Sequence, residues 1–210
     1  MIDTAAIAGK CLDTMLATIQ EHEEELHKLD AVAGDGDHGA GMVRGLKAAV
    51  EVDYDGNAGE VLAQAGSAFS NAAGGASGAL VGMFLMTVGN NLKQDEINTA
   101  AVHTALANGL ATMKKLGKSD VGDKTMIDTL DPFVNALGDA ASRGESVLAA
   151  WTVALPAAEE GRASTVEMIA KRGRSAVLKE KSRGAADPGA TSMLYMLRAV
   201  GDTLQAECST

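Results

Sequence analysis

Residues 29–39 read LDAVAGDGDHG, a turn that ends the first predicted helix and begins the second. Its glycines accept backbone angles that are closed to residues with a Cβ, so a tight turn can direct Asp35 and Asp37 to the same side. Asp30 lies five residues before Asp35, on the last turn of the first helix, where the returning loop brings it to the same point. Three carboxylates this close repel one another unless cations lie among them. The stretch therefore predicts a site of oxygen ligands, the kind that Mg²⁺ prefers, beside a phosphate group.

Other interpretations of this turn compete with the magnesium site. A turn rich in Gly and Asp is also typical of a solvated loop that binds nothing. A calcium EF-hand loop is not matched, because no Glu closes a twelve-residue loop and His38 stands where an oxygen is needed. A zinc site is not matched either, since no second His or Cys follows at ligand spacing. The rest of the chain has to decide between the metal site and the solvated turn.

The composition predicts one acidic domain that spans residues 1–210, since no Pro- or Ser-rich linker divides the chain. The formal net charge of −10 argues against nucleic acid as a partner, because nucleic acid requires a basic face. Cys11 and Cys208 form no CxxC pair, which favours a reducing cytoplasm. No signal peptide is expected. The most apolar run, residues 72–88, is too short and too rich in Gly for a bilayer, so no membrane span is expected.

Helix is favoured nearly everywhere, because aromatic residues make up only 3% of the chain and Ala, Leu, Met, Glu and Lys dominate it. Apolar residues at helical spacing predict a first helix over residues 3–30. The same pattern, with Gly and Pro signals at the ends, predicts helices from just after His38 to 50, over 59–71 and 79–90, from an N-cap at Asp95 to 117, from 126 to 141, over 145–170, and after residue 190. Pro132 lies in the early turns of its helix, and a kink or split is expected at Pro156 and Gly161. The predicted fold class is all-α, with about eight helices.

Further Gly-containing turns precede other helices. Residues 74–78 read GGASG, and such a turn offers free backbone N–H groups and the positive end of a helix dipole to an anion. The Lys-Ser/Thr pair of a Walker A loop is missing. A close crossing of two helices would require small residues here as well, and the sequence leaves both readings open. Residues 121–126 read VGDKTM, 171–174 form a basic KRGR cluster, and 187–190 read DPGA.

Four of these motifs occur together in a characteristic order. The aspartate turn, the GGASG turn, the GDKTM segment and the DPGATS segment follow one another at separations that resemble the nucleotide-binding L subunit of dihydroxyacetone kinase, of the type that depends on the phosphotransferase system. The resemblance covers nearly the whole chain. It implies a barrel of eight antiparallel, amphipathic helices, with the nucleotide and two Mg²⁺ ions at one end.

The same resemblance implies roles for individual residues. It assigns Asp30, Asp35 and Asp37 as ligands of the two Mg²⁺ ions. It places His38, Gly41, Ala76 and Ser77 at the phosphates, Gly117, Thr125 and Met126 at the adenine and ribose, and Arg174, Asp187, Pro188 and Gly189 around the nucleotide. No catalytic residue beyond the metal site is expected, because phosphoryl transfer depends on positioning and charge neutralisation.

The resemblance also implies partners. A separate K subunit would hold dihydroxyacetone, and a phosphohistidine-carrying M subunit would rephosphorylate tightly bound ADP in place, so that the cofactor cycles to ATP. A transcriptional regulator and a second copy of this chain are further expected partners. Two alternatives stay open: a subunit of an ATP-dependent kinase for dihydroxyacetone or a related short ketose such as erythrulose, and a regulatory module whose nucleotide state is read by another protein. A metal-dependent hydrolase is disfavoured, because no His-containing ligand set accompanies the aspartates.

Overall fold

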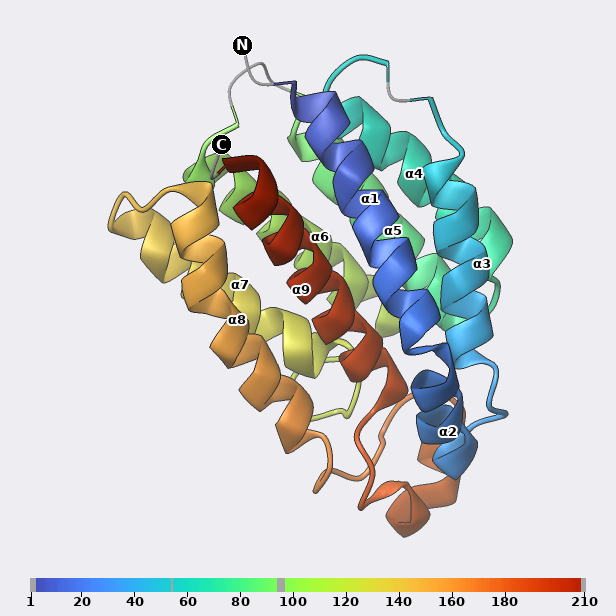
Figure 1. The fold of residues 1–210 in the computed structure, drawn as a ribbon. Coiled ribbons are helices and arrows are strands. Elements are labelled where there is room, and N and C mark those ends of the chain that lie inside the picture. The colour runs from blue at the N-terminus through green and yellow to red at the C-terminus, as the bar shows by residue number, and fades with distance from the viewer. Residues whose placement is uncertain (1–2, 54, 94–96, 209–210) are drawn as a thin grey trace.

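The computed structural model describes residues 3–53, 55–93 and 97–208, apart from the side chains of Arg174 and Cys208, and this part is helical without any strand (Figure 1). The expected all-α class is therefore confirmed. The helices are α1 (Thr4–Glu21), α2 (Glu23–Ala33), α3 (His38–Val50), α4 (Ala58–Ala73), α5 (Gly75–Asn91), α6 (Thr99–Gly117), α7 (Ile127–Ser142), α8 (Val147–Ser164), the 3₁₀ helix η1 (Arg174–Ser182) and α9 (Pro188–Cys208). Within these three ranges, no helix has the length and apolar character needed to cross a membrane.

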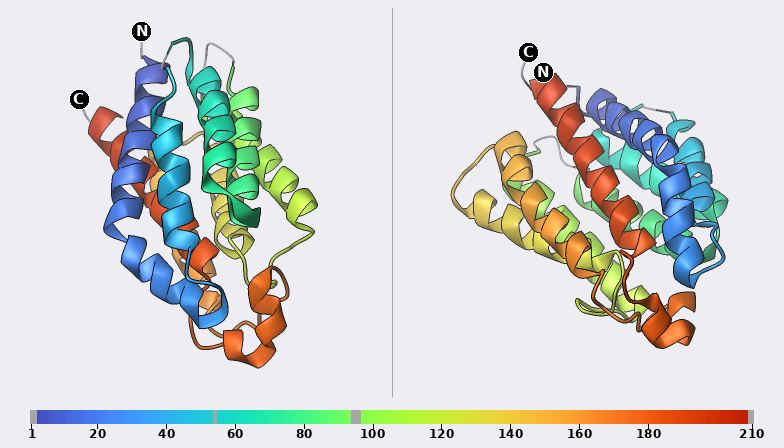
Figure 2. Two further views of the ribbon diagram at one scale, coloured as in Figure 1. Left: turned by 90° about the vertical axis from the view of Figure 1, so that its right-hand side faces the viewer. Right: turned by 60° about the horizontal axis from the view of Figure 1, so that its bottom comes forward.

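The long helices form a closed up-and-down barrel (Figures 1 and 2). From α3 to α9 each helix packs against the next, and α1 contacts both α3 and α9, which completes the ring. The interior is filled by buried side chains, and Phe69 of α4 and Phe133 of α7 are the largest of those that are fully buried. The ring of Phe133 lies edge-on to that of Trp151 in α8, with centroids 4.9 Å apart. The short elements α2 and η1 contact each other at one end of the barrel.

The first helix differs from its prediction. A single helix over residues 3–30 was expected, but α1 ends at Glu21 and α2 begins at Glu23. The residue between them, His22, has φ −101° and ψ 10°, and its ring stacks on that of Tyr195 with centroids 4.0 Å apart. Tyr195 also donates a hydrogen bond of 2.6 Å to Glu25. The helix breaks here because α2 turns toward α9 and η1, a tertiary contact that local periodicity does not contain.

Other helix ends lie within six residues of the expected positions, and α5 begins at Gly75, four residues before its predicted start at residue 79. Asn57 caps α4 reciprocally with Glu60, so this helix starts one residue before the predicted one. The expected N-cap Asp95 lies outside the described residues, and the cap observed for α6 is Asn98, whose side chain accepts from Ala101 N at 2.9 Å. Helix α8 ends at Ser164, six residues earlier than expected, and continues as one element through Pro156.

Pro132 explains a close contact between α7 and α8. It is the sixth residue of α7, and because proline has no N–H, the carbonyl of Asp128 one turn earlier lacks its usual helical donor. Gly161 of α8 packs against this carbonyl so closely that a Cβ at position 161 would collide with it. The pair Pro132 and Gly161 therefore fixes how α8 lies on the first turns of α7, directly beside the loop that precedes α7.

Candidate functional site

One end of the barrel contains a cavity of about 790 Å³ at which four connecting segments meet. These are the loop between α2 and α3, the turn between α4 and α5, the loop between α6 and α7, and the residues before α9. Every predicted site residue with a described side chain lines this cavity: Asp30, Asp35, Asp37, His38, Gly41, Ala76, Ser77, Gly117, Thr125, Met126, Asp187, Pro188 and Gly189. Arg174 begins η1, but its side chain lies outside the described part of the structure. The structure thus brings the predicted residues together, while their individual roles stay predictions.

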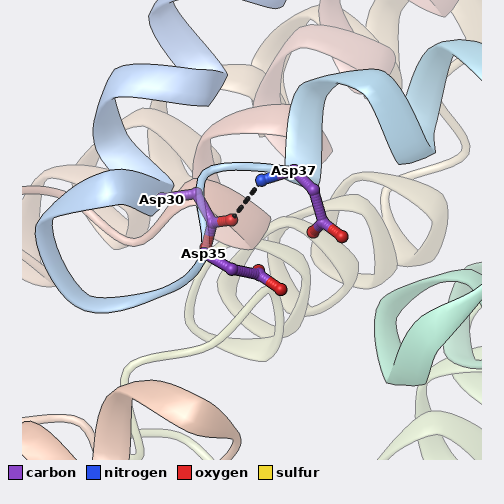
Figure 3. Close-up of side chains that lie close together, drawn as sticks. All are labelled: Asp30, Asp35 and Asp37. Carbon is purple, nitrogen blue, oxygen red and sulfur yellow. Dashed lines mark hydrogen bonds between the residues drawn. The ribbon is translucent and has the colours of Figure 1, made fainter.

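The three aspartates form one carboxylate cluster, with one oxygen of each lying within 4.8 Å of the others. Asp35 and Asp37 extend from the loop in the same direction (Figure 3). Asp30, on the last turn of α2, accepts hydrogen bonds from the backbone N–H groups of Asp37 (3.0 Å) and His38 (3.2 Å). Gly34 leaves room for this carboxylate, because a Cβ there would collide with Asp30 Oδ1. An all-oxygen donor set of this kind suits a hard cation such as Mg²⁺.

His38 is held at the first turn of α3 by a contact with α9. Its Nε2 lies 2.9 Å from Ser192 Oγ, and this hydroxyl donates to the carbonyl of Gly189 at 3.1 Å. Since a hydroxyl donates only one hydrogen, Nε2 of His38 is the donor in the first bond. Burial lowers the pKa of His38, although the charge of Asp30 opposes the shift, so the imidazole is neutral at pH 7.

The turn between α4 and α5 faces the same cavity. Gly74 and Gly75 have φ values of +74° and +65°, which favour glycine, and a Cβ at either position would meet no atom within 4 Å. The close crossing of α4 and α5 lies further along, where a Cβ on Gly82 would come within 2.7 Å of the carbonyl of Gly66. The two readings of the GGASG segment therefore apply to different residues: Gly74 and Gly75 face open space, whereas a Cβ on Gly78 would come within 2.8 Å of Ala73 Cβ in α4. The position of the turn puts the N-terminus of the long helix α5 at the cavity, where unpaired N–H groups favour an anion.

The loop between α6 and α7 is organised by a buried carboxylate. Asp128, which is 2% exposed, accepts from the N–H groups of Gly122 (2.5 Å) and Thr125 (2.7 Å). These bonds fold the loop so that Thr125 and Met126 line the cavity. The neighbouring wall is apolar and comprises Leu80, Met83, Met113 and Leu116. This side of the cavity suits a flat organic group better than a charged one.

Asp187 lies immediately before α9, at the cavity wall. Its carboxylate accepts from Ala190 N at 2.7 Å and so caps the helix. Burial raises the pKa of Asp187 to about 7, against the opposing effects of the Ala190 N–H group and of Lys124. Without a ligand, this carboxyl group is therefore partly protonated near neutral pH.

Three basic cavity residues were not predicted. Arg44 of α3 donates to the last carbonyl of α4, at Ala73 (3.1 Å), next to the Gly-rich turn. Arg172 pairs with Asp123 at 3.1 Å, and Lys124 is buried in the loop between α6 and α7. The signals were present, because Lys124 stands inside the GDKTM motif and Arg172 inside the basic KRGR cluster. A lysine or arginine in a loop usually lies in solvent, so sequence alone does not mark these as cavity residues.

Taken together, the fold and the cavity define an all-helical protein that presents a carboxylate cluster and a helix N-terminus to one enclosed space. Such a space suits a hard cation together with a phosphate-bearing ligand. The sequence pattern of the DAK2 domain matches residues 32–202. The chain therefore belongs to the DAK2 domain family. Asp30 lies two residues before the matched span, so its place in the cluster comes from the structure.

The chain matches relatives of two different lengths. The chain is 40% identical over 201 residues to L-erythrulose 1-kinase of Mycolicibacterium smegmatis, covering 92% of this chain but 34% of that protein. It is 34% identical over 179 residues to the ADP-binding subunit DhaL of the PEP-dependent dihydroxyacetone kinase of Escherichia coli, covering 83% of this chain and 85% of the relative. The chain thus spans about a third of the length of the erythrulose kinases that it matches.

A solved structure supports the same family assignment. The dihydroxyacetone kinase from C. freundii in complex with AMP-PNP and Mg²⁺ superimposes with a TM-score of 0.71 at 27% identity, covering 94% of this chain and 34% of that one. The native form of the same enzyme gives a TM-score of 0.69. The match confirms the predicted helical barrel and the resemblance on which the site assignment was based.

Proposed function

We propose that this chain is the nucleotide-binding phosphoryl-transfer subunit of a dihydroxyacetone kinase. One observation carries the proposal: the carboxylate cluster of Asp30, Asp35 and Asp37 shares a single cavity with the N-terminus of α5. A diphosphate bound between them meets cations on one side and backbone N–H groups on the other. The apolar wall beside Met126 then receives the adenine ring.

Different residues of the cavity would bind different parts of the nucleotide and its metal ions. Asp30, Asp35 and Asp37 would hold two Mg²⁺ ions, which neutralise the charge that develops on the transferred phosphoryl group. Ala76 and Ser77 donate to the phosphates from the first turn of α5, while His38 and Gly41 flank them from α3. Gly117 and Thr125 border the ribose and adenine, and the segment from Asp187 to Gly189, with Arg174, encloses the nucleotide. The protein contributes positioning and electrostatic stabilisation rather than a covalent intermediate.

The phosphoryl donor is the finer part of the proposal. ADP stays bound as a cofactor and is rephosphorylated in place by a phosphohistidine-carrying M subunit, and the phosphoryl group passes to dihydroxyacetone on a K subunit. Support comes from relatives of similar length, since the ADP-binding subunits of E. coli, Listeria innocua and Lactococcus lactis are each 34% identical and are covered over 85% to 91% of their length. A regulator and a homodimer stay as further predicted partners.

A second candidate is a domain with the same role in an ATP-dependent kinase for erythrulose. The identities of 40%, 36% and 34% to three erythrulose kinases favour it. The ketose would bind elsewhere than on this chain, so an assay with dihydroxyacetone and both erythrulose enantiomers, in the presence of the cognate ketose-binding subunit, decides between the two. If only erythrulose is phosphorylated, and only with free ATP as the donor, the erythrulose kinase proposal replaces the dihydroxyacetone kinase proposal.

Native mass spectrometry of the purified protein tests the nucleotide proposal directly. The expected result is an added mass equal to ADP and two magnesium ions. Treatment with EDTA should remove the magnesium part of this mass. Asp37→Asn should lose the metal and weaken ADP binding at least tenfold in calorimetry, whereas Asp139→Asn, at an exposed position of α7, should bind as the wild type does. Equal ADP affinity in the wild type and Asp37→Asn would refute the proposed site.

A further inference from the structure

The 23 residues between α8 and α9 form a closed loop beside the cavity, here called the strap and defined as residues 165–187. Its two ends are tied together, because Asp187 N donates to Thr165 Oγ1 at 3.0 Å and Gly184 N donates to Val166 O at 2.8 Å. Between them the strap carries η1, which contacts α2. Its residues Arg172, Gly173 and Ser175 line the cavity. The position of the strap therefore decides how far the cavity is enclosed on that side.

One side chain from another loop reaches the base of the strap. Lys124, which is 5% exposed, comes from the loop between α6 and α7 and has a left-handed backbone with φ +62°. Its ammonium group donates to the carbonyls of Thr165 and Ala185, each at 2.6 Å. These carbonyls stand at opposite ends of the strap, so Lys124 holds both ends at once. Burying an ammonium group costs free energy unless such partners compensate for the lost water. The two carbonyls are therefore specific partners of the Lys124 ammonium group.

The residue before Lys124 holds the strap at a second point. Asp123 accepts from Arg172 Nε at 3.1 Å through its side chain and from Lys171 N at 3.1 Å through its carbonyl. Burial works to raise the pKa of Asp123, but hydrogen bonds from Asp120 N–H, Arg172 and Lys171 outweigh it and keep the carboxylate ionised. Two adjacent residues of one loop thus hold the strap: Lys124 binds its base, and Asp123 binds Lys171 and Arg172.

The same loop continues directly into the cavity wall. Thr125 and Met126 follow Lys124 and line the cavity, and Asp187 at the end of the strap lies close enough to Lys124 for the two charges to interact. Movement of the base of the strap, at Thr165 and Ala185, away from this loop therefore requires the two bonds of Lys124 to break. Hydrogen bonds from a charged donor are stronger than those between neutral groups, so such opening is rare while Lys124 is present.

From these contacts we infer that Lys124 is a positioning residue that fixes the strap against the cavity and thereby slows the release of bound nucleotide. The inference rests on the proposed function only for the identity of the ligand. Lys124 contacts backbone carbonyls rather than reacting atoms, so its effect should fall on nucleotide retention and strap mobility.

Two measurements on Lys124→Met test the inference. The strap contains six Lys and Arg residues, so trypsin reports its opening. Without nucleotide, the variant should be cut in the strap at least about tenfold faster than the wild type, and with Mg²⁺ present its ADP should dissociate at least about tenfold faster. Lys124→Gln, whose amide retains donors for the same carbonyls, should recover part of both losses. Lys118→Met is the matched control, because Lys118 lies in the same loop with a left-handed φ of +48° but is exposed.

The outcomes separate the inference from the proposed function. A wild-type chain that binds no ADP refutes the proposed function. Its proteolysis still tests whether Lys124 holds the strap. Unchanged strap cleavage or unchanged ADP release in Lys124→Met, with the wild type binding ADP, overturns the inference. If neither variant folds, hydrogen exchange of the wild type decides. The amides of Gly184 in the strap and Thr125 in the loop should then share one opening rate. Rates that differ more than tenfold would show that Lys124 does not hold the strap to the loop.

Discussion

Ser192 Oγ lies 2.9 Å from Nε2 of His38 and donates to the carbonyl of Gly189. A single buried hydroxyl on α9 thus connects the first turn of α3 to the first turn of α9, and both partners line the cavity. Two of the four segments that build the site are therefore held at a fixed separation by one side chain.

Ser192→Ala should cost stability and weaken nucleotide binding. The substitution leaves Nε2 of His38 and the carbonyl of Gly189 without this partner in a buried place, which costs about 1–3 kcal/mol in the free energy of unfolding. Urea denaturation and ADP titration measure the two effects. Ser164→Ala is the control, because its hydroxyl makes the same type of bond, to the carbonyl of Gly161, at an exposed position, and its loss should cost less than about 0.5 kcal/mol. Equal costs for the two variants would contradict the role of Ser192.

The three aspartates should respond differently when magnesium is absent. Asp37→Asn removes one of three clustered charges, so the metal-free protein should melt at a slightly higher temperature, most visibly at low salt. Asp30→Asn should not gain stability in this way, because Asp30 also accepts two backbone hydrogen bonds that order the loop. Thermal melts in EDTA and in millimolar magnesium distinguish these effects. Stabilisation of the two metal-free variants by equal amounts would show that Asp30 has no structural role.

Helical periodicity predicted most of the elements, because their apolar faces point into the barrel and repeat along each helix. The division between α1 and α2 was missed, since it depends on the stacking of His22 on Tyr195, far away in the chain. The closure of the helices into a barrel came from the resemblance to a known family, because periodicity identifies a buried face but not the helix that covers it.

The site was predictable where residue type alone expresses the chemistry. Clustered carboxylates repel one another and so point to cations, and that reasoning located Asp35 and Asp37 from the sequence. The GGASG turn was ambiguous, because the free space around Gly74 is a property of the folded chain. Lys124 was overlooked for the same reason, since only its burial against two carbonyls distinguishes it from a surface lysine.

Replacing two glycines of α5 by alanine should have different main effects, a loss of stability at Gly82 and a loss of ADP affinity at Gly75. A Cβ on Gly82 would come within 2.5 Å of Ser70 Cβ and within 2.7 Å of the carbonyl of Gly66, so Gly82→Ala should lose about 1–3 kcal/mol of stability as α4 and α5 are forced apart. Gly75→Ala meets no neighbour within 4 Å, but alanine disfavours φ +65° by about 1–2 kcal/mol and would disturb the turn at the cavity. Urea denaturation and ADP titration of both variants should show the larger stability loss for Gly82 and the larger affinity loss for Gly75. The reverse ranking would mean that the turn is the packed crossing.

Asp187 should make the stability of the ligand-free protein fall as pH rises. Its pKa is raised by burial to about 7 in the folded chain, from an ordinary value of 3.8. Between these two pH values the folded state holds a proton that the unfolded state releases, so each rise in pH favours unfolding, by at most about 1.4 kcal/mol per pH unit for one proton. Asp187→Asn keeps an oxygen that can cap α9 but cannot titrate. The stability of the wild type relative to this variant should therefore decline from about pH 4 to pH 7 and then level off.

Asp120 provides the opposite slope for comparison. A hydrogen bond from Lys114, together with the Val121 N–H group, lowers the pKa of Asp120, so its contribution to stability is present above the ordinary pKa and is lost as pH falls through the lowered value. Relative to Asp120→Asn, the wild type should thus lose stability toward acid, whereas relative to Asp187→Asn it should lose stability toward neutral pH. Urea denaturation at half-unit steps from pH 3 to pH 8 measures both differences. A flat difference for Asp187→Asn would mean that solvent in the cavity keeps the Asp187 carboxylate ionised throughout this pH range.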